Sequence, residues 1–194
     1  FLGKAHAHAI AGAGGIPVLA DIQKDSAEKL ADAIQQEYKV PALGVGRDIT
    51  KKKEVENLLD VVLEKLGRVD ILINNAANNP KVGAKISDDW TRFENLPIDV
   101  WEADLAVGLT GAFLCSQVLG TEMAQRGKGV IVNISSDLGV IAPDQRLYEK
   151  GETPPDKQPV KPVTYSVAKT GLIGLTRYLA TYWAKKNVRV NCIS

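Results

Sequence analysis

The stretch "VDILINNA" (69–76) decides the fold, because an unbroken apolar run changes abruptly to two asparagines. A continuous apolar run predicts a strand that is buried on both faces, as in a parallel sheet covered by helices. The stretch "GVIVNISS" (129–136) has the same form and also ends in polar residues. Two such strands predict a parallel sheet whose carboxyl edge gathers polar side chains.

Helical patterns alternate with these strands along the whole chain. Residues 26–38 and 51–66 carry apolar side chains at helical spacing. Further helices are expected over 4–15, 97–126 and 162–187, and further strands over 16–22, 41–49 and 188–194. This alternation predicts a single α/β domain over 1–194, a doubly wound, three-layer parallel sheet of the Rossmann type. Ligands of such sheets bind beyond the carboxyl ends of the strands.

Composition narrows the class of protein. The 194 residues include 45% hydrophobic and 24% charged residues, which is typical of a soluble globular domain. The net charge of +1 and the lack of a basic cluster argue against nucleic acid or an anionic membrane as a partner. No run of about 18 apolar residues that could span a bilayer is recognised. Cys115 and Cys192 are far apart, which predicts free, buried thiols in a reducing compartment, the cytoplasm. His6 and His8 face different ways on a helix, so no metal site is expected.

The stretch "TYSVAK" (164–169) places Tyr165 four residues before Lys169 at the start of a helix. Positions four apart share one helix face, so the phenol and the ammonium can meet. A nearby cation favours the phenolate and lowers the pKa of a phenol from its usual value of about 10. Tyr-x-x-x-Lys alone is a loose pattern, and an ordinary helix surface is the alternative.

Four motifs together resemble the short-chain dehydrogenase/reductase family: "NNAA", "NISS", "YSVAK" and "RVNCIS", in this order and across essentially the whole chain. The resemblance implies an enzyme that moves a hydride between a nicotinamide and a secondary alcohol or ketone. It assigns Tyr165 as the acid/base, Lys169 as the group that tunes it, and Ser136 as the hydroxyl that orients the substrate oxygen. Ser135 is the less favoured candidate for that last role.

The cofactor residues follow from the same resemblance. Leu2 and Gly3 correspond to the end of a glycine-rich, phosphate-binding turn. Asp21, 18 residues after Gly3, is expected to bond the adenosine ribose. Ile22 follows it where an Arg or Lys would hold a 2′-phosphate, which favours NAD over NADP and leaves NADP open. The alternative is that Asp21 caps a turn.

Asp48 is expected near the adenine, or else as a cap of the 51–66 helix. Of the paired asparagines, one is expected to brace the sheet, while Asn75 and Ala76 line the cofactor. The remaining cofactor-binding residues that the resemblance implies are Ile49 and Ala77, with Tyr165 and Lys169 at the nicotinamide ribose.

The resemblance also predicts that the chain is incomplete at both ends. It implies a missing first strand, which lies in the middle of the family's sheet, and a missing substrate-binding tail. We therefore expect the 194 residues alone to fold poorly and to hold the cofactor weakly.

Gly108 departs from the family pattern, which has an asparagine of the proton relay at this position. This makes a dinucleotide-binding protein without activity one alternative function. The charged, proline-rich residues 142–162 widen the gap between Ser136 and Tyr165. They suggest a lid over a polar, sugar-like substrate, or else a solvated insertion that touches nothing. Together with the stretch "VKPVTYSVAKTGLIGLTRYLATYWAKK" (160–186), they resemble reductases of surface-glycan or flagellin sugar biosynthesis. An NADP-dependent 3-oxoacyl thioester reductase is the second alternative.

The helices at 97–126 and 162–187 are apolar on several sides, which suggests a homodimer or homotetramer. The expected interface residues are Leu172, Leu175, Leu179 and Trp183.

Overall fold

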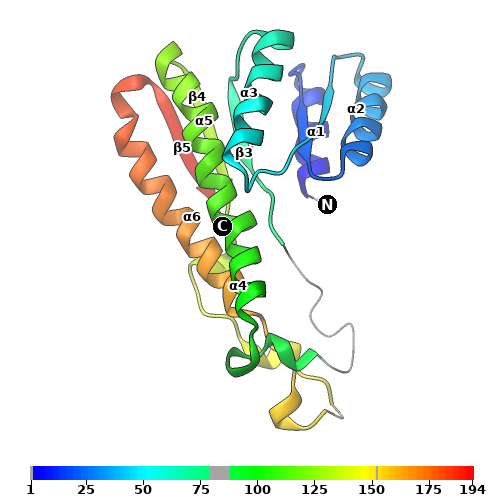
Figure 1. The fold of residues 1–194 in the computed structure, drawn as a ribbon, viewed down its shortest axis with the longest axis vertical. Helices are drawn as coiled ribbons and strands as arrows, with labels where there is room; N and C mark the ends of the chain where they lie inside the picture. Colours follow the sequence, from blue (N-terminus) through cyan, green and yellow to red (C-terminus); the bar gives the residue numbers. More distant parts are fainter. Residues whose placement is uncertain (1, 79–87, 152) are drawn as a thin grey trace.

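The computed structural model describes residues 2–78, 88–151 and 153–194, and its strands form two parallel sheets (Figure 1). In the first sheet, β1 (Val18–Asp21) pairs with β2 (Leu43–Gly46). In the second, β4 (Gly129–Ile134) lies between β3 (Ile71–Asn74) and β5 (Val188–Ile193). The predicted fold class, a parallel α/β sheet of the Rossmann type with flanking helices, is confirmed.

The helices connect these strands in the predicted order. They are α1 (Leu2–Gly12), α2 (Lys24–Tyr38), α3 (Lys52–Leu66), α4 (Ile98–Leu105), the π-helical turn η3 (Ala106–Thr110), α5 (Gly111–Arg126) and α6 (Val163–Tyr182). Short 3₁₀ turns are η1 (Asp88–Thr91), η2 (Phe93–Asn95), η4 (Asp137–Gly139), η5 (Gln145–Tyr148), η6 (Pro155–Lys157) and η7 (Ala184–Lys186). Both α3 and α5 end at a glycine in the left-handed region, Gly67 and Gly127, where a side chain would be strained.

The expected single helix over 97–126 is interrupted by the π-helical turn. Gly108 is buried at the centre of this turn, and a Cβ there would lie 3.3 Å from the Cβ of Ala168 in α6. The missing side chain lets the two helices approach closely at this point. π-Helical turns occur mostly as local bulges and are frequent at functional sites.

The segment Ile98–Arg126 is long and apolar enough to cross a membrane by length and composition alone. The expectation that the chain holds no such run was therefore wrong. In the structure, however, α5 buries Cys115, Leu119 and Met123 in the main hydrophobic core. Its apolar character is thus used for packing within the domain.

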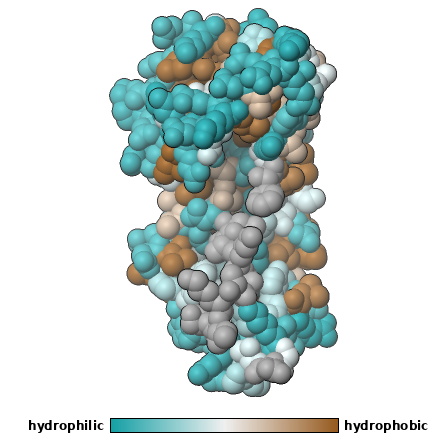
Figure 2. Space-filling model, turned by 90° about the vertical axis from the view of Figure 1, so that its right-hand side faces the viewer, coloured by the Kyte–Doolittle hydropathy of each residue, from teal (hydrophilic) through white to brown (hydrophobic). Residues whose placement is uncertain are grey.

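The apolar side chains form two clusters of unequal size. The larger one joins β4 and β5 to α3 and α5, and it contains the fully buried Val55, Met123 and Ile131. The smaller one lies between α1 and α2, around Ala7, Ala11 and Ile34. Figure 2 views the molecule from the side of these two N-terminal helices, whose outer surface is largely hydrophilic. The N-terminal part therefore buries fewer large apolar side chains than the rest.

A cleft of about 910 Å³ separates the two sheets. Val18 and Ala20 of β1 line one wall, and Ile71 and Ile73 of β3 line the other. The family resemblance places a further strand in the middle of the sheet, and this cleft lies at that position. That strand stays a prediction.

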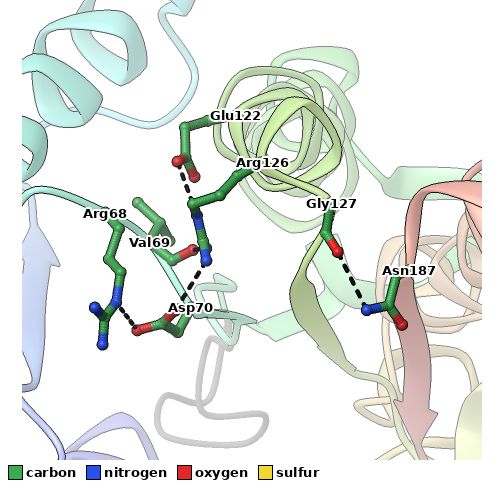
Figure 3. A network of polar contacts seen from close by, with 7 residues as sticks. All are labelled: Arg68, Val69, Asp70, Glu122, Arg126, Gly127 and Asn187. Atoms are coloured by element: carbon green, nitrogen blue, oxygen red, sulfur yellow. Dashed lines mark hydrogen bonds and ion pairs between the residues drawn. The ribbon is translucent and has the colours of Figure 1, made fainter.

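A polar network fixes the amino end of β3 to the last turn of α5 (Figure 3). Arg126 donates to the carbonyl of Val69 and to Oε1 of Glu122, and its Nη1 lies 3.3 Å from Oδ1 of Asp70. The other carboxylate oxygen of Asp70 accepts a hydrogen bond of 2.9 Å from Nε of Arg68. The Arg68 hydrogen bond is the main cause that lowers the pKa of the Asp70 carboxyl.

The structure corrects the expected subunit surface on α6. Leu172, Leu179 and Trp183 are 2%, 8% and 7% exposed within the single chain, so they belong to its own interior. Trp183 lies directly on Gly120 of α5, where a Cβ would come within 2.6 Å of the indole ring. Assigning these three residues to an interface was wrong, because helical periodicity does not reveal which neighbour covers an apolar face. The oligomeric state stays a prediction.

Candidate active site

A chain of buried side-chain hydrogen bonds crosses the carboxyl end of the second sheet. Nδ2 of Asn74 donates to Oδ1 of Asn133 (2.8 Å) and to Oγ of Ser116 (3.1 Å). Nδ2 of Asn133 donates to Oγ1 of Thr176 (2.8 Å), which in turn donates to the carbonyl of Leu172 (2.7 Å). This chain joins β3, β4, α5 and α6. Asn74 is therefore the asparagine that braces the sheet.

The braced helix α6 presents Lys169 and Tyr165 on one face. Lys169 is 5% exposed, and its Nζ donates a hydrogen bond of 2.7 Å to the carbonyl of Ile134 at the end of β4. The same Nζ lies 5.6 Å from the centre of the Tyr165 ring. Burial is the main cause that lowers the pKa of the Lys169 ammonium; the charge of Cys192 opposes this effect and that of Lys161 adds to it. The phenol and the ammonium share one small volume, as the spacing predicts.

The two serines after β4 have different partners. Ser135 is buried, and its hydroxyl donates to the backbone carbonyl of Lys169 over 2.8 Å. Ser136 is half-buried; its hydroxyl donates to Oδ1 of Asp137 (2.7 Å) and accepts from the N–H of Leu138 (3.2 Å). The Ser135 hydroxyl is thus committed to holding α6 against β4. The Ser136 hydroxyl is the more accessible of the two.

A cavity of about 10 Å³ lies between the π-helical turn and α6. This volume is close to the smallest that holds one water molecule. Its lining residues are Ala77, Asn78, Asp104, Gly108, Thr164, Tyr165, Ala168 and Lys169. Oδ2 of Asp104 accepts a hydrogen bond of 2.6 Å from the hydroxyl of Thr164. The sequence analysis missed Asp104 and Thr164, since nothing in their spacing shows that α4 packs beside the start of α6.

The expected cofactor residues at the strand ends gather at the large cleft. Those that line it are Gly3, Asp21, Ile49, Asn75 and Ala76. A Cβ on Gly3 would lie 3.1 Å from Nδ2 of Asn75, so the missing side chain lets the start of α1 approach the end of β3. A helix N-terminus with free backbone N–H groups near a carboxylate suits a phosphate and a ribose. These residues fit a dinucleotide.

Two further expected residues point outward: Leu2 is 58% and Ile22 74% exposed. Asp21 makes the turn contact that was its alternative role, whereas the alternative role of Asp48 was wrong, because the N-cap of α3 is Lys51 and no side chain caps this helix. Oδ1 of Asp21 accepts from the N–H of Gln23 (2.8 Å). Oδ1 of Asp48 accepts from the N–H and the hydroxyl of Thr50 (3.0 and 2.6 Å), and this hydroxyl is the main cause that lowers the pKa of Asp48.

The 142–162 loop (residues 142–162) packs against the segment that precedes α4 (Figure 1). The N–H of Val160 donates to Oγ1 of the buried Thr91 (3.1 Å), and Nη1 of Arg92 donates to the carbonyl of Pro155 (3.2 Å). The alternative of an insertion that touches nothing is therefore wrong. Near its end the loop carries Lys161, whose Nζ lies 3.8 Å from the centre of the Tyr165 ring. The sequence analysis did not single out Lys161.

Within residues 2–78, 88–151 and 153–194, no group of three His, Cys, Asp or Glu side chains could hold a metal ion. His8 instead lies 3.2 Å from the hydroxyl of Tyr38. The thiol of Cys115 is buried, which raises its pKa to about 12. Cys192 is a free, half-buried thiol.

A parallel α/β sheet with a Tyr-x-x-x-Lys pair at its carboxyl edge defines a class of dinucleotide-dependent proteins. Residues 2–148 match the short chain dehydrogenase family, and residues 157–194 match the family described as enoyl-(acyl carrier protein) reductase. The chain belongs to the short-chain dehydrogenase family.

Several known proteins are similar over the whole chain. An NAD-dependent glycerol dehydrogenase of Listeria innocua is 32% identical over 193 residues, which are 100% of this chain and 65% of that protein. A 3-oxoacyl-[acyl-carrier-protein] reductase of Synechocystis is 30% identical over 197 residues, 100% of this chain and 68% of that protein. The crystal structure of an NAD⁺-bound xylitol dehydrogenase superposes with a TM-score of 0.83 at 26% identity, covering 100% of this chain and 65% of that one. The chain thus spans about 65% of the length of the glycerol dehydrogenase that it matches.

Proposed function

We propose that the full-length protein is an oxidoreductase that moves a hydride between a nicotinamide cofactor and a secondary alcohol or ketone. The observation that carries this proposal is the pairing of Tyr165 with Lys169, whose ammonium is fixed on the Ile134 carbonyl 5.6 Å from the phenol ring. A fixed cation beside a phenol stabilises the negative charge that forms when the phenol gives up its proton. Family membership supports the same chemistry.

The roles of the site residues follow from the direction of alcohol oxidation. Ser136 orients the substrate hydroxyl, Tyr165 takes its proton, and Lys169 stabilises the resulting charge. A nicotinamide bound beside these residues would supply the acceptor for the hydride of the carbinol carbon. In the reduction of a ketone, Tyr165 donates the proton instead. Ser135 and Asn133 act on the site through α6, because they hold this helix on β4.

The cofactor would lie along the carboxyl edge of both sheets. The start of α1 at Leu2 and Gly3 would hold the pyrophosphate, and Asp21 would bond the adenosine ribose. Asp21 would also repel a 2′-phosphate, and Ile22 and Gln23 after it offer no cation. NAD is therefore the proposed cofactor, with NADP as the alternative. Asp48 and Ile49 would lie at the adenine. The residues nearer the nicotinamide would be Asn75, Ala76, Ala77, Tyr165 and Lys169.

The proposed substrate is a polar, polyhydroxylated metabolite. The 142–162 loop supports this class, since it lies close to Tyr165 and is rich in charged residues. The similarity to a glycerol dehydrogenase and to a xylitol dehydrogenase supports it independently. The similarity to a 3-oxoacyl-[acyl-carrier-protein] reductase keeps the thioester ketone as the alternative. The sugar-biosynthesis subgroup, the homo-oligomer and the cytoplasmic location stay predictions.

A paired assay of the full-length protein tests the proposal. Nicotinamide absorbance would be followed with NAD⁺ or NADP⁺ against glycerol, xylitol, free sugars and nucleotide sugars, and with NADH or NADPH against acetoacetyl thioesters. We expect turnover with NAD⁺ and a polyol or sugar. Tyr165→Phe should lower kcat at least about 100-fold, because it removes the only proton acceptor proposed for the reaction. Tyr178→Phe, at an exposed tyrosine of the same helix, is the matched control and should keep full activity.

Three other outcomes would change the assignment. Preference for NADPH and an acetoacetyl thioester would select the 3-oxoacyl reductase. Full turnover in Tyr165→Phe would remove the acid/base role from this tyrosine. Cofactor binding by calorimetry, with no turnover on any of these substrates, would favour a binding protein, and Gly108→Asn would then be the next variant.

A further inference from the structure

We propose that Lys161 is a second positioning cation of the acid/base Tyr165, delivered to it by the 142–162 loop. This inference rests on the proposed function, because it assigns a role only if Tyr165 moves a proton. Nζ of Lys161 lies 3.8 Å from the centre of the Tyr165 ring, and Nζ of Lys169 lies 5.6 Å from the same centre. The phenol therefore has two ammonium groups close to its ring.

The loop holds Lys161 in place at two backbone positions. The N–H of Lys161 donates to Oε1 of Gln145 (2.9 Å), and the N–H of the preceding Val160 donates to Oγ1 of Thr91 (3.1 Å). Pro162 follows directly and is the N-cap residue of α6. Lys161 is thus fixed between the loop and the helix that carries Tyr165. This anchoring fixes the backbone from which the Lys161 side chain reaches the Tyr165 ring.

The charge of Lys161 acts on the phenolate more than on the phenol. A cation within about 6 Å of an aromatic ring centre is attracted to its face, and a negative charge on the ring strengthens this attraction. Lys161 is half-buried, so water screens its charge only in part, and burial lowers the pKa of its ammonium. Removing this charge should therefore disfavour the proton-accepting form of Tyr165.

In the described part of the chain, few other titratable groups lie near the Tyr165 ring. Lys169 lies beside the ring on α6, Cys192 acts on Lys169 from β5, and Asp104 of α4 lines the small cavity beside Tyr165. Lys161 also adds to the lowering of the pKa of Lys169, after the larger effects of burial and Cys192. Two ammonium groups thus lie beside the Tyr165 ring, that of Lys161 from the loop and that of Lys169 from α6.

The test is the pH profile of kcat/KM for alcohol oxidation by the full-length protein, with whichever of glycerol or xylitol is turned over faster. We expect Lys161→Met to move the acidic limb of this profile by about half a unit to one unit toward higher pH. Activity below the limb should fall about threefold to tenfold, and the two profiles should converge at high pH, where Tyr165 is in its proton-accepting form in both proteins. Lys161→Arg keeps a cation at the ring and should restore the original limb. Lys157→Met, at an exposed lysine of the same loop, should leave the profile unchanged.

The outcomes separate this inference from the proposed function. If Tyr165→Phe abolishes turnover while Lys161→Met leaves the acidic limb in place, Lys161 has no such role and the proposed function stands. A higher KM for Lys161→Met with an unshifted limb would also overturn the inference, since it would make Lys161 a substrate contact. If Tyr165→Phe keeps full activity, the proposed function itself fails, and the role of Lys161 fails with it.

Discussion

The N-terminal and C-terminal sheets of this molecule are stabilised in different ways. The C-terminal part carries most of the larger apolar cluster and a continuous chain of buried side-chain hydrogen bonds that joins β3 and β4 to α5 and α6. In the N-terminal part, α1 and α2 form a small cluster against which Leu19 of β1 packs, while Val45 of β2 belongs to the larger cluster. Strand β1 faces a cleft of about 910 Å³. The proposed catalytic pair lies on the first of these parts, whereas Gly3 and Asp21 lie on the second. The proposed acid/base pair is therefore held by one part alone, whereas the proposed cofactor residues lie on both parts.

The largest difference is expected when one buried isoleucine of each part is truncated in the full-length protein. Ile131 and Ile34 are both fully buried, in the larger and the smaller cluster respectively. Ile131→Ala should lower the free energy of unfolding by about 4 kcal/mol and Ile34→Ala by about 2 kcal/mol, because the smaller cluster can relax around the lost atoms. Urea denaturation measures both values. Equal losses would mean that the two parts pack equally tightly.

The second prediction concerns the hydrogen-bond chain of the C-terminal sheet. Asn133→Ala leaves the buried amide of Asn74 and the hydroxyl of Thr176 without this partner, and should cost about 2–3 kcal/mol of unfolding free energy. Asn191→Ala, at an exposed asparagine of β5, is the matched control and should cost less than about 0.5 kcal/mol. A comparable loss in both variants would show that the buried chain is not what stabilises this sheet.

The two parts also differ in how much of them the sequence predicted. The apolar strands "VDILINNA" and "GVIVNISS" gave a correct parallel sheet, since such runs have few other ways to be buried. Helical spacing showed that Tyr165 and Lys169 could meet, but their assignment to the site came from the resemblance of four motifs to one family. Periodicity could not show the π-helical turn at Gly108, nor that Leu172, Leu179 and Trp183 are covered by the same chain. Both depend on which helix packs beside which.

The residues that sequence analysis missed at the site are brought there by tertiary contacts. Asp104 reaches the site because α4 lies beside α6, and Lys161 because the 142–162 loop is anchored on Thr91. Neither contact has a spacing that can be recognised in the chain. Local patterns and the family motifs thus identified Lys169 and the polar residues after β3 and β4, but not Asp104 and Lys161, whose place depends on tertiary packing.

The third prediction compares two helical glycines within the C-terminal part. A Cβ at Gly120 would lie 2.6 Å from the ring of Trp183, so Gly120→Ala should cost about 1–2 kcal/mol by forcing α5 and Trp183 apart. Gly174 of α6 has open space where its Cβ would lie, and Gly174→Ala should instead stabilise by about 0.5–1 kcal/mol through its helix propensity. Thermal unfolding measures both. Opposite signs would confirm that close helix packing, and not the loss of a glycine as such, determines the effect of Gly120→Ala on stability.

The smallest expected effect concerns Asp70, whose ion pairs fix the amino end of β3 (Figure 3). Arg68 lowers the pKa of this carboxyl in the folded protein, so Asp70 stabilises the fold above its unfolded pKa of about 4. This contribution is lost as the pH falls through the lowered value. Because the Asp70 side chain is 46% exposed, solvent screening limits it to about 0.5 kcal/mol at pH 7. Asp70→Asn should therefore cost about that much at pH 7, less at high salt, and nothing at a pH of about 2.

Denaturation of this variant and of Asp60→Asn, an exposed carboxylate of α3, at both pH values measures the effect. If Asp70→Asn lowers the free energy of unfolding equally at low pH, the loss comes from the shape or hydration of the side chain and not from its charge. The amino end of β3 would then depend on the bond from Arg126 to the Val69 carbonyl, which does not titrate with Asp70. In that case the C-terminal sheet would stay more strongly stabilised than the N-terminal sheet across the whole acidic pH range.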